Sequence, residues 1–159
     1  MDITLKQLEK VKKHYEALEE YKNFIEKMEF DFTKRSFESL DTMQKAVLEA
    51  YLKRFASLQD YLGAKVFRTL LDNAGISYRK MSEVLTLIEK EEIVSLDRWI
   101  ELRTLRNNLE HDYSDELEET LEDLKICVEN FSYLQDVTKR VFAFARRYNE
   151  NIPVFDKWV

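Results

Sequence analysis

Residues 41–75 read DTMQKAVLEAYLKRFASLQDYLGAKVFRTLLDNAG, and this segment decides the fold. It begins with Asp41, a residue type that caps helix N-termini, and it ends at Asn73 and Gly75, which favour helix C-termini. Between these ends, apolar residues recur at steps of three and four: Met43, Val47, Tyr51, Phe55, Leu58, Leu62, Val66 and Leu70. This spacing predicts one long amphipathic helix with a buried stripe.

The same periodicity recurs along the rest of the chain. It predicts helices over residues 4–28, 78–90, 96–109 and 117–144, the last of which carries the longest stripe. Only two glycines and one proline occur in 159 residues, so the sequence has few of the turn residues that a sheet needs. We predict an all-α fold, an antiparallel up-down bundle of four to five helices in a single domain spanning 1–159. The tail, 148–159, is interrupted by Pro153, and its aromatic residues are expected to dock on the bundle.

Composition narrows the classes of function. The net charge of −6 disfavours a general nucleic-acid coat, although it allows a local basic site. A single cysteine, Cys127, allows no internal disulfide and is expected to be a small buried residue. The two histidines, His14 and His111, lie far apart in sequence, so neither a metal site nor a cofactor is predicted. No long apolar run or cleavable leader is recognisable, and we expect a cytoplasmic protein that does not enter the membrane.

The densest group of chemically versatile residues is Arg106-Asn107-Asn108-Leu109-Glu110-His111-Asp112-Tyr113. Arginine can bind a phosphate through two parallel hydrogen bonds, and histidine can exchange a proton near neutral pH. Residues five apart on a helix lie about 140° apart around its axis, so Arg106 and His111 converge only if the helix ends or bends before His111. The residues after His111 favour such an ending. The alternative is structural, in which these side chains cap the helix and pair with neighbouring carboxylates.

Two further arginines are candidate supporting cations. Arg103 lies one turn before Arg106 in the same predicted helix. Arg54 belongs to a group, Lys53, Arg54, Gln59 and Asp60, that interrupts the strongly apolar segment 41–75. A purely solvated role for Arg54 is the alternative.

At these residues the sequence resembles the HEPN superfamily, whose ribonucleases carry an arginine, a polar residue and a histidine in the pattern Arg-polar-x(3–5)-His. The resemblance is to the HepT-like branch in particular, where the motif reads Arg-x4-His-x-Tyr. Arg106, Asn107, His111 and Tyr113 fill it position by position. The resemblance covers roughly residues 5–145, and the tail from about residue 148 lies outside it.

This resemblance implies a HEPN-like homodimer in which two motifs face each other across an RNA-cleaving cleft. Arg106, Asn107 and His111 would be catalytic in a metal-independent RNA endonuclease. In that reaction the ribose 2′-hydroxyl of the RNA attacks the adjacent phosphate and leaves a 2′,3′-cyclic phosphate. The protein would be the toxin of a type VII-like toxin-antitoxin pair, with tRNA among the candidate substrates. Its partner, a minimal nucleotidyltransferase antitoxin, would silence it by transferring AMP from ATP to Tyr113. The second class of function is a non-catalytic helical subunit that binds a nucleotidyltransferase or its substrate.

Overall fold

A computed structural model describes residues 2–112 and 116–158, together with their side chains except at positions 110–112, 157 and 158. The described residues contain helices and no strand, and the all-α prediction is confirmed. In chain order the helices are α1 (Ile3–Lys27), α2 (Lys34–Glu38), α3 (Thr42–Tyr61), the π-helical turn η1 (Leu62–Val66), α4 (Phe67–Asn73), α5 (Met81–Lys90), α6 (Leu96–Asp112), α7 (Leu117–Glu129), α8 (Phe131–Arg146) and α9 (Phe155–Trp158).

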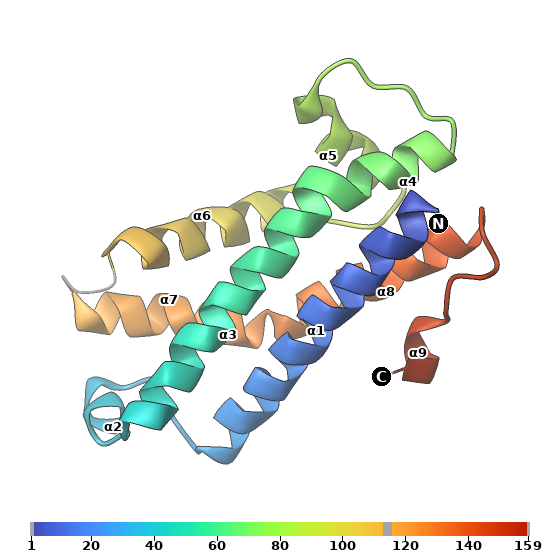
Figure 1. Ribbon diagram of the computed structural model, residues 1–159. Coiled ribbons are helices and arrows are strands. Elements are labelled where there is room, and N and C mark those ends of the chain that lie inside the picture. Colours follow the sequence, from blue (N-terminus) through green and yellow to red (C-terminus); the bar gives the residue numbers. More distant parts are fainter. Residues whose placement is uncertain (1, 113–115, 159) are drawn as a thin grey trace.

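The helices form a bundle in which α3 occupies a central position (Figure 1). Helix α1 runs antiparallel to α3 and packs along much of its length. On the other side of α3, α6 and α7 form a second antiparallel pair, and α8 packs against α1. The bundle therefore places the end of α6, which carries the Arg106 motif, against both α3 and α7.

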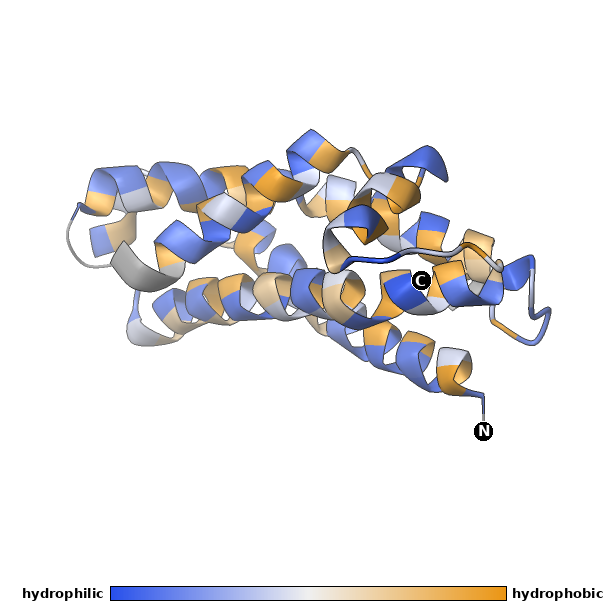
Figure 2. Ribbon diagram, turned by 90° about the horizontal axis from the view of Figure 1, so that it is seen from above, coloured by the Kyte–Doolittle hydropathy of each residue, from blue (hydrophilic) through white to orange (hydrophobic). Residues whose placement is uncertain are grey.

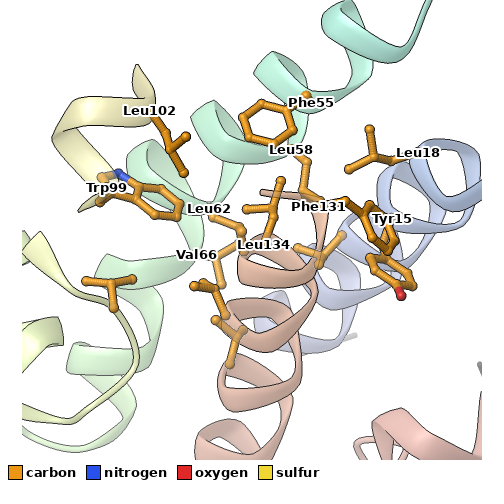
Figure 3. Close-up of a cluster of buried hydrophobic side chains, with 14 of the residues drawn as sticks. Tyr15, Leu18, Phe55, Leu58, Leu62, Val66, Trp99, Leu102, Phe131 and Leu134 are labelled. Atoms are coloured by element: carbon orange, nitrogen blue, oxygen red, sulfur yellow. The ribbon is translucent and has the colours of Figure 1, made fainter. Parts of the chain in front are cut away.

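Each long helix buries one stripe, so apolar and polar residues alternate along the ribbons (Figure 2). The stripes meet in one continuous core (Figure 3). Its labelled members come from α1, α3, η1, α6 and α8: Tyr15, Leu18, Phe55, Leu58, Leu62, Val66, Trp99, Leu102, Phe131 and Leu134. Asp41 caps α3 as predicted, and it does so in a reciprocal capping box with Gln44.

The helix predicted over residues 117–144 is wrong in one respect, because it is divided into α7 and α8 at Asn130. The Asn130 side-chain amide donates to the carbonyl of Ile126 at 2.7 Å, and its oxygen accepts two hydrogen bonds from the Arg98 guanidinium. An asparagine side chain that binds backbone in this way competes with the helical pattern. The hydrophobic spacing continues through the break, which is why periodicity alone does not detect it.

The prediction that the tail docks on the bundle is confirmed for Phe155. This side chain is buried, with its ring centre 5.3 Å from that of Tyr15 and 6.2 Å from that of Phe142. The Arg146 guanidinium also donates to the carbonyl of Ile152. Aromatic contacts and a charge-assisted hydrogen bond therefore hold the chain end against α1 and α8.

The two glycines give opposite predictions for stability. A Cβ atom at Gly63 would lie 3.7 Å from the Trp99 indole, an ordinary contact, so Gly63→Ala should stabilise the helix by about 0.5–1 kcal/mol. Gly75 follows α4 with a φ of 72°, so Gly75→Ala should cost about 1–2 kcal/mol. Urea unfolding of the two variants measures both. A stabilised Gly75→Ala or a destabilised Gly63→Ala would contradict the backbone geometry.

Candidate functional site

Arg106 is a buried side chain that attaches α6 to α3. Only 4% of it is exposed. Its Nε donates to Gln59 Oε1 at 2.9 Å, and its Nη2 forms an ion pair with Asp60 Oδ1. The Asp60 side chain is itself 61% exposed, so the pair lies at the edge of the core with its carboxylate facing water.

Gln59 extends this contact back to α6. It is buried, and its Nε2 donates to the backbone carbonyl of Trp99 at 3.0 Å. Gln59 therefore accepts a hydrogen bond from Arg106 and donates one to Trp99, which lies two turns earlier on α6. These hydrogen bonds fix the rotation of α6 relative to α3, because a rotation of either helix would leave buried polar atoms unsatisfied.

Trp99 makes the apolar half of the same junction. Its indole is buried, packs 5.2 Å from the Phe67 ring centre and covers Gly63. Gly63 lies in the π-helical turn η1, directly after α3. A π-turn inserts an extra residue into a helix and shifts the faces that follow it, and such turns are frequent at functional sites. Here the turn accommodates the large indole beside the residues that bind Arg106.

Helix α7 contributes Cys127 to this junction. Its thiol is buried, and that burial is the main reason why its pKa is raised to about 12, with the Asp123 carboxylate adding to the rise and the Arg106 charge opposing it. The Tyr51 hydroxyl donates to the Cys127 carbonyl at 2.9 Å and joins α3 to α7. Cys127 is thus the small buried residue that the sequence predicts, and its high pKa makes it a poor nucleophile.

A different face of α6 is open to solvent. Arg103, Asn107 and Asn108 are exposed, whereas Arg106 is buried. Positions 103, 107 and 111 follow one another at four-residue steps, so they lie along one strip of the helix. We call positions 103, 107 and 111 the α6 strip. The side chain of His111 lies outside the described residues, and so does Tyr113 altogether.

The expectation that the helix ends or bends before His111 is wrong, because α6 continues to Asp112. Positions 106 and 111 are therefore about 140° apart around the axis of one helix. Within a single chain, the fold places Arg103 and Asn107 on the strip that includes position 111, and it directs Arg106 toward α3. Arg54 is remote from this group on the face of α3 that packs on α1, where it contacts His14.

Two residues of this site, Gln59 and Asp60, are identified only by the structure. The sequence contains a signal for them, since both interrupt the apolar segment 41–75 together with Lys53 and Arg54. Among the described residues, no three His, Cys, Asp or Glu side chains are grouped in a way that could hold a metal ion. The described helices also include none with the length and apolar character needed to cross a membrane.

In comparisons with known proteins, the chain matches no family model, no curated protein and no solved structure.

Proposed function

We propose that this protein is a metal-independent RNA endonuclease of the HEPN type and the toxin of a toxin-antitoxin pair. The observation that carries the proposal is the α6 strip, where an exposed arginine and an exposed asparagine precede the position of a histidine at helical spacing. Side chains of these types supply a cation for phosphate, a polar orienting group and a proton carrier. The motif Arg106-Asn107-x3-His111-x-Tyr113 has the composition expected of this chemistry.

The proposed reaction is attack by a ribose 2′-hydroxyl on the adjacent phosphorus. The 2′-oxygen forms a bond to phosphorus while the bond to the 5′-oxygen of the next nucleotide breaks. One proton leaves the 2′-hydroxyl to a base, and one is delivered to the departing 5′-oxygen. His111 can serve at either step because its unperturbed pKa lies near neutrality. The products are a 2′,3′-cyclic phosphate and a 5′-hydroxyl, and no water molecule is consumed.

A symmetric homodimer supports this chemistry better than a single chain. Because α6 is helical through position 112, Arg106 and His111 of one chain do not face the same point. Two copies of α6 related by a two-fold axis bring the strip of one chain opposite that of the other. In the proposal, the partner nucleotidyltransferase switches the toxin off by attaching AMP to Tyr113, which adds charge and bulk where RNA would bind.

Cleavage of RNA is the experiment that tests this function, and two adjacent asparagines give a matched pair. Asn107→Ala should lower the cleavage rate at least about tenfold if its amide orients the reacting groups. Asn108→Ala changes another exposed asparagine on the same helix and should retain the wild-type rate. EDTA should leave activity intact, and the product should carry a cyclic phosphate. Equal rates for the two variants, or cleavage abolished by EDTA, would contradict the proposed mechanism.

The second candidate is a non-catalytic helical subunit that binds a nucleotidyltransferase or its substrate. Two observations favour it. Arg106 is already bound to Asp60 and Gln59, as expected of a structural arginine. The first turns of α7 are also strongly acidic, with Glu118, Glu119 and Glu122 all exposed. Absence of cleavage together with stable binding of the nucleotidyltransferase would favour this second function.

A further inference from the structure

A second group of cations lines a pocket between α1 and α3, away from Arg106. The pocket has a volume of about 300 Å³ and is lined by Tyr21 of α1 and by Ala50, Lys53, Arg54 and Ser57 of α3. Two of these five side chains are cationic and none is a carboxylate. Its size falls at the lower end of the range for small-molecule sites, roughly 300–1,000 Å³.

Arg54 is held in this pocket by a histidine. Its Nη1 lies 3.1 Å from His14 Nδ1. A guanidinium can only donate, so Nδ1 must accept, and His14 must be neutral with its proton on Nε2. The pKa of His14 is lowered, first by burial and then by the charges of Arg54 on α3 and Lys10 on α1. The side chain that orients Arg54 is therefore uncharged near neutral pH.

The charge of Arg54 thus lacks the compensation that Arg106 has. Arg106 is paired with a carboxylate, but no described carboxylate lies within ion-pair distance of Arg54 or Lys53. Lys10 adds a third cation to the same side of α1, with its Nζ 4.7 Å above the Tyr61 ring centre. Arg54 is half-buried whereas Lys53 and Lys10 are exposed, so burial disfavours mainly the Arg54 charge, and an approaching anion would offset that cost. The pocket remains cationic although the whole chain carries a net charge of −6.

We infer that this pocket binds a phosphomonoester, the dianionic phosphate found both on free nucleotides and at the 5′ ends of RNA. The Arg54 guanidinium can donate two parallel hydrogen bonds to phosphate oxygens, and Lys53 supplies a point charge. Tyr21 and Ser57 also line the cavity, and their hydroxyls are of a type that can donate to phosphate oxygens. Two lining cations match the charge of a phosphomonoester better than the single charge of a backbone phosphodiester. The inference does not rest on the proposed ribonuclease function.

Titration of the protein with inorganic phosphate tests the site. Calorimetry measures the affinity, and NMR of the Arg54 side chain reports whether phosphate binds at Arg54. Arg54→Gln and Lys53→Gln should each weaken binding about tenfold or more, the effect of losing a charge-assisted hydrogen bond. Arg35→Gln and Lys45→Gln remove the same charges from α2 and from the other end of α3, and they should retain wild-type affinity. Lys53 is exposed, so its variant reports on binding even where Arg54→Gln is destabilised.

Three further ligands separate recognition of a terminal phosphate from recognition of backbone phosphates, and the relative affinities of the first two identify the source of the terminal phosphate. AMP and a 5′-phosphorylated oligonucleotide should each compete with inorganic phosphate, whereas the same oligonucleotide with a 5′-hydroxyl should not. Competition by both oligonucleotides alike would show recognition of backbone phosphates and would overturn the inference of a phosphomonoester site. It would also be overturned if phosphate fails to bind, or if the control variants weaken binding as much as Arg54→Gln and Lys53→Gln.

Discussion

Arg106→Ala is expected to lower the free energy of unfolding by about 2–3 kcal/mol, because the substitution leaves Gln59 Oε1 without its donor inside the core. Loss of the apolar part of the side chain from a packed junction adds to this cost. The ion pair itself contributes less, since the Asp60 carboxylate is 61% exposed and can return to water. Urea unfolding monitored by circular dichroism measures the change.

Asp60→Asn is the control for this prediction. It keeps an oxygen acceptor near Arg106 Nη2 and leaves Gln59 paired, so it should cost less than Arg106→Ala. A double-mutant cycle of the two substitutions isolates the contribution of their interaction. Neutral surface substitutions change the free energy of unfolding by up to about 0.5 kcal/mol. If the free energy of unfolding of Arg106→Ala lies within that range of the wild-type value, the guanidinium does not join α6 to α3 as described.

This stability effect changes how loss of activity is interpreted. A buried arginine that fixes the rotation of α6 affects every residue of the α6 strip when it is removed. Loss of RNA cleavage in Arg106→Ala would therefore combine lost chemistry with displaced neighbours. The exposed Asn107 has no comparable structural role in the core, so its substitution separates the two causes. Activity of Arg106→Ala has to be measured at a temperature where the variant is fully folded.

Asp60 also constrains the proposed mechanism. In the structure, the Nη2 edge of Arg106 is directed at this carboxylate, so a substrate phosphate must compete with Asp60 to reach it. Arg103 is exposed and lies on the α6 strip, away from Asp60, so Asp60 does not compete with phosphate for it. We therefore expect Arg103 to make the first contact with RNA phosphate in the proposed function. Arg106 acts mainly as a positioning residue unless Asp60 moves.

Much of the fold follows from hydrophobic spacing, and the exceptions have physical causes. The stripe in residues 41–75 predicts a continuous helical segment because burial of one face dominates helix stability in proteins. The break at Asn130 escapes prediction because it depends on a side chain that binds the Ile126 carbonyl and the Arg98 guanidinium. Neither contact changes the apolar periodicity. The docking of Phe155 is predictable because an exposed aromatic terminus gains stability by covering apolar surface.

The site is less predictable than the fold. Spacing relates Arg103 to Asn107 on one predicted helix because that relation is local, but position 111 joins them only because α6 continues to Asp112. The partners of Arg106 are 46 and 47 residues away in sequence, and only the packing of α3 on α6 brings them together. The pairing of Arg54 with His14 likewise joins residues 40 positions apart. Arginine is usually exposed, so composition gave no reason to expect Arg106 in the core.

His111→Ala is expected to have the largest effect on function, a loss of about 10²–10⁴-fold in the rate of RNA cleavage, because general acid-base catalysis contributes factors of that size. Urea unfolding of the variant establishes whether it is folded under the assay conditions, and Asn108→Ala provides a control on the same helix with normal activity. Wild-type cleavage by a folded His111→Ala protein would exclude the histidine from the chemistry. The pH–rate profile of the wild type should have a limb near the pKa of histidine, and the profile of His111→Ala should lack that limb.

The same variant tests whether the site is shared between two chains. If Arg106 and His111 act from opposite subunits, then refolding an equal mixture of Arg106→Gln and His111→Ala should restore activity, although each variant alone is inactive. Half of the dimers would be mixed, and each mixed dimer would hold one complete pair of two, giving up to roughly a quarter of wild-type activity. Positions 106 and 111 of one chain are about 140° apart around α6, but Arg106 is buried against α3 of its own chain, so restored activity also requires Arg106 to leave Asp60. An inactive mixture in which mixed dimers are demonstrated by mass spectrometry would place both groups in the same subunit and refute the shared site.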